Sequence, residues 1–178
     1  MPWLFGYGSI VWRPNLEYVR KRPALLKGWG RSFNQKSYDH RGTPEAPGRV
    51  LTLRQDQQRD CLGMAFEISD AAWRDTMAYL DHREKGGYVR TAIEVEIEGE
   101  TVSAVSYIAP PGNPHDAGGE SIEHIVQVIH SACGPSGSNR EYLLALMHAL
   151  AQSEIKDPYL DSVLAAFHQL DHSPDSVQ

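Results

Sequence analysis

Residues 88–109, YVRTAIEVEIEGETVSAVSYIA, contain the clearest β-hairpin in the sequence. From Tyr88 to Ile97, apolar residues alternate with polar ones, which is typical of a strand with one buried face. Glu98-Gly99-Glu100 forms the turn, and Thr101 to Ala109 returns as a second strand. Antiparallel pairing between neighbouring strands is therefore the first expected element of the fold.

Four further short strands are expected before this hairpin, at Trp3–Tyr7, Ala24–Phe33, Arg49–Leu53 and Cys61–Ile68. Gly28 and Gly30 interrupt the second of them and predict a bulge or a sharp bend. Six short strands with bends marked by glycine favour a strongly coiled sheet or a small barrel.

Four helices are also expected. Asp70 is expected to cap the first, which runs to about Lys85, and an apolar stripe marks a second one that stops at Gly134-Pro135. A capping box formed by Ser138 and Glu141 opens the third, and Asp157-Pro158 opens a fourth that ends near Leu170.

Because most helices follow the strands, the expected class is α+β, a small mixed or antiparallel β-barrel with flanking helices. The 178 residues predict a single domain. The polar segment at residues 172–178 is expected to be a frayed tail.

Composition excludes several classes of function. With 17 Lys and Arg against 23 Asp and Glu, the net charge of −6 predicts no nucleic-acid partner and no anionic membrane surface. No apolar run is long enough to span a membrane, and two cysteines predict neither a disulfide framework nor a zinc site. We therefore expect a cytoplasmic enzyme for a small molecule, with no metal and no cofactor. The sequence sets no oligomeric state.

One carboxyl group is expected on an apolar helix face. Trp73, Met77, Leu80 and Glu84 lie on one side of the first expected helix. Desolvation on that face, and the negative end of the helix dipole, would both raise the pKa of Glu84. A glutamate with a raised pKa suits a general base that works near neutral pH.

The neighbours of Glu84 leave a second interpretation open. Arg83 and Lys85 are expected to point about 100° away on either side of the helix, so neither needs to pair with Glu84. A buried Glu84 could instead pair with an arginine such as Arg90 and have no catalytic role. These residues alone favour neither interpretation.

Gly6-Tyr7-Gly8-Ser9 follows the first strand and predicts a close approach of the backbone to a ligand. A dinucleotide site is not expected, because Val11 stands in place of the third glycine of that fingerprint. Ser9 also lacks the G-x-S-x-G frame of a nucleophile elbow. The exposed N–H groups could bind a carboxylate, although a simple bend in the chain is an equally good explanation.

Three other segments are candidates for a functional role. Gly134-Pro135-Ser136-Gly137 opens a helix, and its N–H groups could bind an anion, or the segment could be an ordinary capped helix start. The loops at Ser37–Gly48 and Ala109–Gly119 are long for a compact domain, and such loops often act as lids over a site.

Five motifs in order resemble the ChaC family of glutathione-specific γ-glutamylcyclotransferases. They are FGYGSIVW at 5–12, DHRGT at 39–43, PGRV at 47–50, YLDHRE at 79–84 and GPSG at 134–137. The resemblance extends from about Trp3 to Leu170 and implies a small β-barrel with flanking helices. Ile10 stands where leucine is more common in the family, a change that conserves volume.

The resemblance also implies a reaction without metal or cofactor. The α-amine of a γ-glutamyl group attacks its own γ-carbonyl, and glutathione yields 5-oxoproline and cysteinylglycine. By resemblance Glu84 is the acid and base, Tyr142 lines the site, and the Ser37–Gly48 loop closes over it. The γ-glutamyl group would be held by Leu4, Phe5, Gly6, Tyr7, Gly8 and Ser9.

Two alternatives accompany the glutathione hypothesis. The same reaction could act on other γ-glutamyl amino acids or γ-glutamylamines, or the chain could be a γ-glutamyl-binding module without turnover. The DHRGT segment at 39–43 favours glutathione by resemblance, and the presence of Glu84 counts against a module that only binds.

Overall fold

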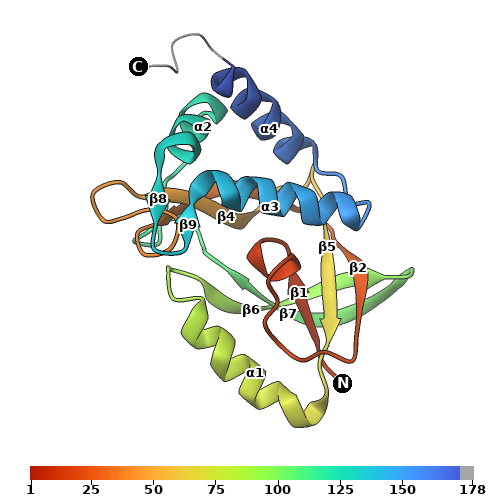
Figure 1. The fold of residues 1–178 in the computed structure, drawn as a ribbon. Helices are drawn as coiled ribbons and strands as arrows, with labels where there is room; N and C mark the ends of the chain where they lie inside the picture. The colour runs from red at the N-terminus through yellow and green to blue at the C-terminus, as the bar shows by residue number, and fades with distance from the viewer. Residues whose placement is uncertain (173–178) are drawn as a thin grey trace.

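The computed structural model describes residues 1–172, and the predicted frayed tail at 172–178 lies outside this range except for His172. The central feature is a closed barrel of five strands in the order β1-β5-β2-β6-β7, flanked by helices (Figure 1). The predicted α+β class and small barrel are confirmed. The barrel strands are β1 (Trp3–Gly6), β2 (Arg20–Leu26), β5 (Cys61–Glu67), β6 (Val89–Ile97) and β7 (Glu100–Ile108).

The hairpin at residues 88–109 forms β6 and β7, which pair antiparallel along their whole length. Ile93, Val95 and Ile97 of β6 are buried, because alternate residues of a strand point to the same side. β1 runs parallel to β7 and antiparallel to β5, while β2 runs antiparallel to both of its neighbours. The barrel is therefore mixed, and it closes where the first strand meets the last.

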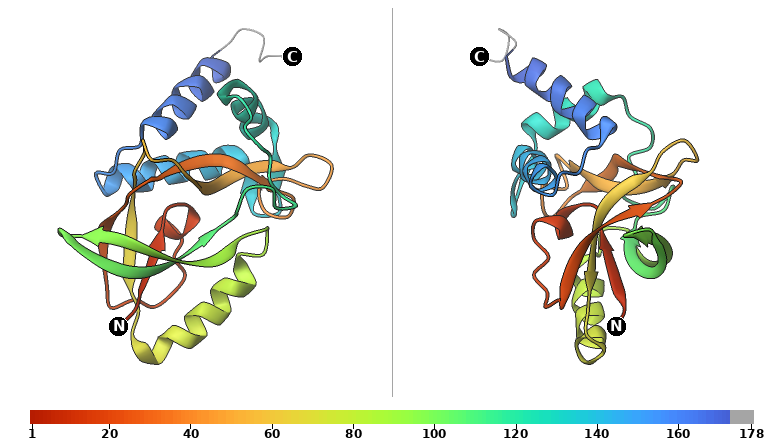
Figure 2. Two further views of the ribbon diagram at one scale, coloured as in Figure 1. Left: turned by 180° about the vertical axis from the view of Figure 1, so that it is seen from behind. Right: turned by 90° about the vertical axis from the view of Figure 1, so that its right-hand side faces the viewer.

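The predicted strand Ala24–Phe33 is two strands in the structure. The chain turns at Gly28, whose φ of +72° lies in the left-handed region that favours glycine. The strand after the turn, β3 (Trp29–Ser37), leaves the barrel and pairs with β4 (Gly48–Gln55) in a separate two-stranded sheet. This sheet lies between the barrel and the helices of the last third of the chain (Figure 2).

Four α-helices and one short 3-10 helix lie within residues 1–172. The α-helix α1 lies on one side of the barrel, and the other three α-helices lie together on the opposite side (Figure 1). A short hairpin with two residues in each strand joins α2 to α3. The bounds are η1 (Ser9–Val11), α1 (Asp70–Arg83), α2 (Ile122–Ser131), β8 (Cys133–Gly134), β9 (Gly137–Ser138), α3 (Asn139–Gln152) and α4 (Pro158–Asp171).

The helix ends differ from the prediction at three places. Ser69, and not Asp70, caps α1, because its hydroxyl accepts from the N–H of Ala72 and Asp70 is already the first helical residue. α1 ends at Arg83 and not near Lys85, and α2 ends at Ser131, before the glycine and proline that were expected to stop it. The capping box of Ser138 on α3 and the Asp157 cap of α4 are confirmed. In the described part of the chain, no helix is both long and apolar enough to cross a membrane.

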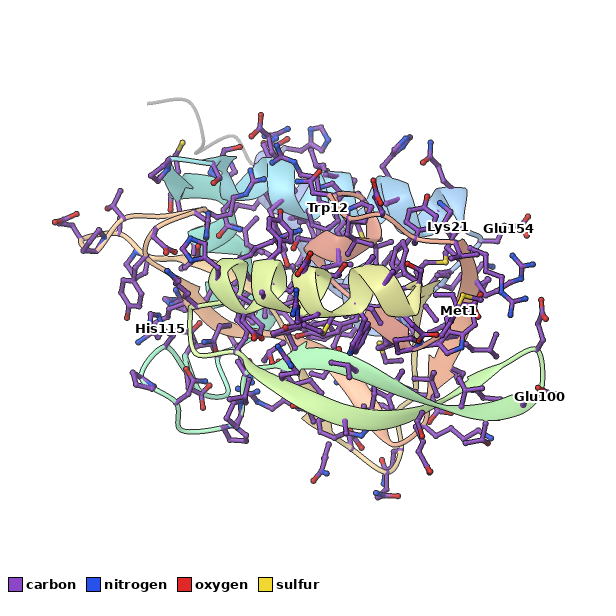
Figure 3. The ribbon with its side chains drawn as sticks, turned by 90° about the horizontal axis from the view of Figure 1, so that it is seen from below. Met1, Trp12, Lys21, Glu100, His115 and Glu154 are labelled. Carbon is purple, nitrogen blue, oxygen red and sulfur yellow. The ribbon has the colours of Figure 1, made fainter. Side chains whose placement is uncertain are left out.

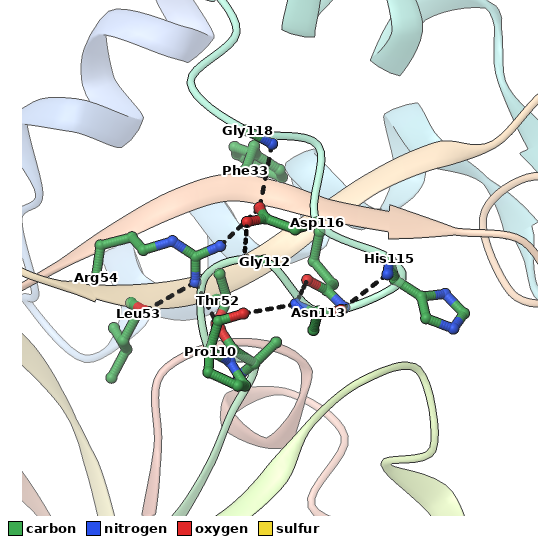
Figure 4. A network of polar contacts seen from close by, with 12 residues as sticks. Phe33, Thr52, Leu53, Arg54, Pro110, Gly112, Asn113, His115, Asp116 and Gly118 are labelled. Carbon is green, nitrogen blue, oxygen red and sulfur yellow. Dashed lines mark hydrogen bonds and ion pairs between the residues drawn. The ribbon is translucent and has the colours of Figure 1, made fainter.

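A polar network fixes the loop between β7 and α2 to β4 (Figure 4). Arg54 Nη2 lies 2.9 Å from Asp116 Oδ1, and Asp116 also accepts hydrogen bonds from the backbone N–H groups of Gly112 and Gly118. Arg54 Nη1 donates to the carbonyl of Ala109 at 2.5 Å. This loop, one of the two possible lids, is attached to the sheet from its first residue.

Candidate active site

Two adjoining cavities lie between the end of α1, the start of η1 and helix α3. The larger has a volume of about 340 Å³ and the smaller, inner one of about 30 Å³. Ser9, Glu84, Tyr88 and Tyr142 line both of them. Trp12 lines the larger cavity and lies between α1 and α3 in the view from below (Figure 3). Glu84 is therefore at the junction of the two spaces.

The inner cavity brings together most of the residues predicted to bind substrate. Its wall includes Phe5, Gly6, Tyr7, Gly8 and Ser9, together with Glu84 and Tyr142. Leu4 is the exception. It is fully buried in the barrel, opposite Phe66 and Val105 on the neighbouring strands, and it lines neither cavity.

Close packing favours glycine at both positions of this segment. A Cβ atom at Gly6 would lie 3.0 Å from Cγ2 of Ile10, and one at Gly8 would lie 3.3 Å from the hydroxyl oxygen of Tyr142. These separations are tighter than ordinary van der Waals contacts. The glycines therefore let the chain turn against Ile10 and bring its backbone close to Tyr142.

A fully buried arginine holds the same segment from behind. Arg31 Nε donates to the carbonyl of Tyr7 at 2.8 Å, and Nη2 donates to the carbonyl of Leu62 at 2.7 Å. Nη1 pairs with Asp157, the N-cap of α4, at 2.8 Å. This role of Arg31 could not be predicted from the sequence. The pattern that could have indicated a buried side chain is its position two residues before Phe33, on the same face of the strand.

Glu84 is the C-cap of α1 and not part of its last turn. Its backbone has φ −93° and ψ 52°, and its N–H group donates to the carbonyl of Leu80 at 2.8 Å. The side chain is 15% exposed. Burial raises the pKa of Glu84, and the nearby Arg83 and His40 act in the opposite direction. The predicted direction of the shift is confirmed.

Arg83 connects Glu84 to the glycine-containing segment. Its Nε lies 3.3 Å from Glu84 Oε1, its Nη2 donates to Ser9 Oγ at 3.0 Å, and its Nη1 donates to the carbonyl of Arg13 at 3.0 Å. The expectation that Arg83 and Glu84 need not pair is wrong. The helix ends between them, so the angular spacing of a regular helix does not apply.

The alternative partner of Glu84 is engaged elsewhere. Arg90 forms its ion pair with Asp81, one turn earlier on α1. Arg90 is therefore not the partner of Glu84, and the arginine that pairs with Glu84 is Arg83.

Two tyrosines complete the wall at the junction, the buried Tyr142 and the half-buried Tyr88. Tyr88 donates its hydroxyl hydrogen to the carbonyl of Leu51 at 2.5 Å, and the hydroxyl of Tyr142 accepts from the N–H of Leu51 at 3.2 Å. Burial raises the pKa of Tyr142 to about 12. Both tyrosines are thus anchored to β4, and Tyr142 stays neutral around pH 7. Trp12 packs edge-on against Tyr142, with ring centres 5.2 Å apart.

The chain after Glu84 is fixed by polar contacts. Gln35 is fully buried, donates to the carbonyl of Gly86 and exchanges two hydrogen bonds with Asn113. Gly87 has a φ of +87°, and a Cβ there would collide with the side chain of Asn113. The position of Glu84 is therefore set on one side by the helix and on the other by this glycine turn.

The Gly134–Gly137 segment does not provide a free helix N-terminus. Ser138 caps α3 by accepting from the N–H of Glu141, and Glu141 accepts in return from the N–H of Ser138. The interpretation as a capped helix start is the one that the structure supports.

The assembled site has the groups needed to move a proton beside a bound ligand. A carboxyl group with a raised pKa faces an inner recess that is lined by backbone and neutral hydroxyl groups, and such a carboxyl can accept a proton in one step and return it in another. Within residues 1–172, no group of three or more His, Cys, Asp or Glu side chains is arranged to hold a metal ion.

Comparison with known proteins identifies the family of the chain. The family model described as "ChaC-like protein" matches residues 2–170. Glutathione-specific gamma-glutamylcyclotransferase 1 of Danio rerio is 39% identical over 171 residues, covering 92% of this chain and 87% of that protein. The glutathione-specific gamma-glutamylcyclotransferase of Escherichia coli K12 is 31% identical over 180 residues, covering 98% of this chain and 77% of the other.

Solved structures show the same fold. The crystal structure of a yeast γ-glutamyl cyclotransferase specific to glutathione superimposes with a TM-score of 0.89 at 29% identity, over 96% of this chain and 97% of that one. A structure named gamma-glutamyl cyclotransferase shares the fold at a TM-score of 0.58 and 14% identity, over 92% and 86% of the two chains. From the family match and these relatives we conclude that the chain belongs to the ChaC-like family.

Proposed function

We propose that this chain is a γ-glutamylcyclotransferase that acts on glutathione and releases 5-oxoproline and cysteinylglycine. Relatives that cover most of the chain are named for this activity. The observation that carries the proposal is the position of Glu84, a buried carboxyl group at the junction of the two cavities, next to the Gly6–Ser9 segment.

The cavity sizes support one orientation of the substrate. The inner cavity, at about 30 Å³, has room for one small group. Because the γ-carbonyl has to reach Glu84 for the reaction, we place the α-carboxylate or α-amine of the γ-glutamyl end in it, beside Gly6, Tyr7 and Gly8. The remainder of glutathione lies in the larger cavity of about 340 Å³. In this orientation the γ-carbonyl carbon comes next to Glu84.

The reaction needs one proton to be removed and one to be returned. The α-amine loses a proton to the carboxylate of Glu84 and forms a C–N bond with the γ-carbonyl carbon. The original bond between that carbon and the cysteine nitrogen then breaks. The departing amine takes the proton back from Glu84, so the enzyme ends the cycle unchanged.

The main contribution of the protein is then to hold the substrate folded. When the amine and the carbonyl of one molecule are held in position to react, the activation free energy falls by several kcal/mol, and by roughly 7 kcal/mol or more in the best intramolecular reactions. Asp39, His40 and Arg41 of the Ser37–Gly48 loop line the larger cavity. This supports the proposed role of the loop in excluding water, which would otherwise hydrolyse the amide.

A cytoplasmic location is part of the proposal. Cys61 is buried and Cys133 is exposed, and both are free thiols. Free thiols persist in the reducing cytosol, where reduced glutathione is also found.

The test is a substrate panel with purified protein. Glutathione, oxidised glutathione and γ-glutamyl-alanine are incubated separately, and 5-oxoproline is measured by mass spectrometry. We expect 5-oxoproline and cysteinylglycine from reduced glutathione. Faster turnover of γ-glutamyl-alanine would identify the enzyme as one for other γ-glutamyl compounds. Binding of glutathione without any 5-oxoproline would contradict the proposal and identify a binding module.

A further inference from the structure

Arg41 is a buried cation with spare hydrogen-bond donors on the wall of the larger cavity. It is 8% exposed and lines that cavity but not the inner one. Within the described residues, the side chain donates only through Nη1, to the carbonyl of Ser138 at 3.0 Å and to Glu141 Oε2 at 3.4 Å. Nε and Nη2 therefore remain for a ligand, since a guanidinium group carries five N–H donors.

The charge of Arg41 is weakly compensated by the protein. Glu141 is its one carboxylate partner in the described part of the chain, and the Glu141 side chain is 68% exposed. An ion pair to an exposed carboxylate contributes little stabilising free energy, because water screens the attraction. By contrast, Arg83 in the same cavity already contacts Glu84 and three other groups. Arg41 is thus the buried cation of this cavity with donors to spare.

The guanidinium group is held over a residue of the active site. Its central carbon lies 5.9 Å from the centre of the Tyr142 ring, within the range of a cation–π contact. Tyr142 lines both cavities, whereas Arg41 lines only the larger one, so this contact holds the guanidinium group on the wall of the larger cavity and outside the inner recess.

The backbone around Arg41 is held by hydrogen bonds and by close packing against the GPSG segment. The N–H of Arg41 donates to Ser37 Oγ at 3.0 Å, and the N–H of Ser136 donates to the carbonyl of His40 at 2.9 Å. A Cβ atom at Gly134 would lie 2.5 Å from the carbonyl oxygen of His40. The loop and the GPSG segment therefore pack backbone against backbone.

Gly137 leaves space for the side chain itself. Its φ is +106°, and a Cβ there would lie 3.0 Å from Arg41 Nη1 and would collide with Glu141. Two motifs far apart in the sequence, DHRGT and GPSG, thus meet to hold one guanidinium group against the cavity. Such preorganisation is what a binding group requires.

We propose that Arg41 binds the glycyl carboxylate of glutathione and so selects substrates whose leaving half carries that charge. This inference rests on the proposed function. The γ-glutamyl end is next to Glu84 and the inner cavity, where Arg41 does not reach, so the carboxylate within its reach is the one on the leaving half. A planar guanidinium group matches a carboxylate with two parallel hydrogen bonds. A local cation is needed because the protein as a whole carries a net charge of −6.

The test compares glutathione with its ethyl ester, in which the glycyl carboxylate is neutral. For the unmodified enzyme we expect kcat/KM to be roughly 10- to 100-fold higher for glutathione, the range of one charged hydrogen bond. Arg41→Met should lower kcat/KM for glutathione by about the same factor and change that for the ester less than about 3-fold. Arg41→Lys, which keeps the charge, should recover part of the preference for glutathione.

Each remaining outcome decides the question. If the unmodified enzyme uses both compounds equally well, Arg41 does not read the carboxylate, although the proposed function stands. An equal loss for both substrates in Arg41→Met would mean a structural role or contact with the γ-glutamyl end, and it would overturn the inference. If glutathione yields no 5-oxoproline at all, the proposed function fails and the inference with it. Arg74→Met, which removes a charge that is 94% exposed, is the matched control and should change neither rate.

Discussion

Two carboxyl groups at the same end of α1 have opposite environments. Asp81 is 49% exposed, and the hydrogen bond from the Tyr107 hydroxyl, at 2.6 Å, holds its pKa below the ordinary value of 3.8, with Arg90 acting in the same direction. Glu84, three residues later, is 15% exposed, and burial raises its pKa above 4.5. Environment, and not residue type, therefore separates the pKa of Asp81 from that of Glu84, the residue that we propose as the proton carrier.

The two groups also connect α1 to different parts of the molecule. Asp81 attaches the helix to the β6–β7 hairpin through Tyr107 and Arg90. Glu84 faces the cavities, and Arg83 connects it to Ser9. If this comparison is correct, changes at Asp81 should affect stability and changes at Glu84 should affect turnover.

The largest expected effect is on turnover. Glu84→Gln keeps the shape of the side chain but removes the proton acceptor, and we expect kcat for glutathione to fall by roughly 100- to 10,000-fold. Asp81→Asn, the matched control, should stay within about 3-fold of the unmodified enzyme. The measurement is the rate of 5-oxoproline release by both variants. Equal losses at both positions would remove the distinction between them.

A smaller effect is expected in the pH profile. Because Glu84 must be ionised to accept a proton, kcat/KM should rise with pH through a pKa above 4.5. Arg83 and His40 lower that pKa, and the buried hydroxyl groups of Tyr7, Tyr88 and Tyr142 face the same carboxyl. Of these two groups, Arg83 lowers the pKa of Glu84 more. Arg83→Met removes its charge, so the pKa of Glu84 increases and the rise of kcat/KM should move to higher pH.

Arg83→Lys is the control for this experiment, since it keeps the charge beside Glu84. Its profile should stay closer to that of the unmodified enzyme. A rise that moves to lower pH in Arg83→Met would show that Arg83 does not act on Glu84 in this way.

The smallest effect is on thermal stability, and its sign differs between the two positions. The lowered pKa of Asp81 means that its ionised form stabilises the fold above pH 3.8, and this stabilisation is lost as the pH falls through the folded-state pKa. Asp81→Asn should therefore lower the Tm at pH 7, and the difference should disappear in acid.

At Glu84 the sign is reversed. A raised folded-state pKa means that stability falls as the pH rises from 4.5 through the folded-state value. Glu84→Gln removes this cost and should raise the Tm at pH 7, by up to about 4 °C for each kcal/mol recovered. The gain should vanish below pH 4.5. Calorimetry at about pH 2, at pH 4 and at pH 7 measures both variants, and the lowest pH is needed because Asp81 titrates below 3.8. A Tm at pH 7 that falls in Glu84→Gln would contradict the assignment of its raised pKa.

Local patterns predicted most of the elements of the fold. The β6–β7 hairpin and the caps of α3 and α4 depend on residues close together in sequence, so alternation and cap chemistry identified them. The separation of β3 from the barrel could not be predicted in this way. The separation of β3 depends on its pairing with β4, which is distant in sequence. A glycine such as Gly28 is compatible both with a bend inside one strand and with a turn between two strands.

The site was predictable in part for the same reason. An apolar helix stripe and a glycine-containing turn drew attention to Glu84 and Gly6–Ser9, which the structure brings together. The contacts that position them come from distant residues, such as Arg31 behind Tyr7 and Gln35 behind Gly86. An arginine or a glutamine on a strand gives no local sign of which backbone carbonyl it will contact.

The most direct test of Glu84 as proton carrier is a crystal structure of the Glu84→Gln variant with glutathione bound. The account predicts intact glutathione, with its γ-glutamyl end against Gly6–Ser9 and its α-amine within hydrogen-bond reach of the side chain at position 84, roughly 2.6–3.2 Å. An α-amine that contacts another acidic or basic group, with position 84 out of reach, would contradict the account.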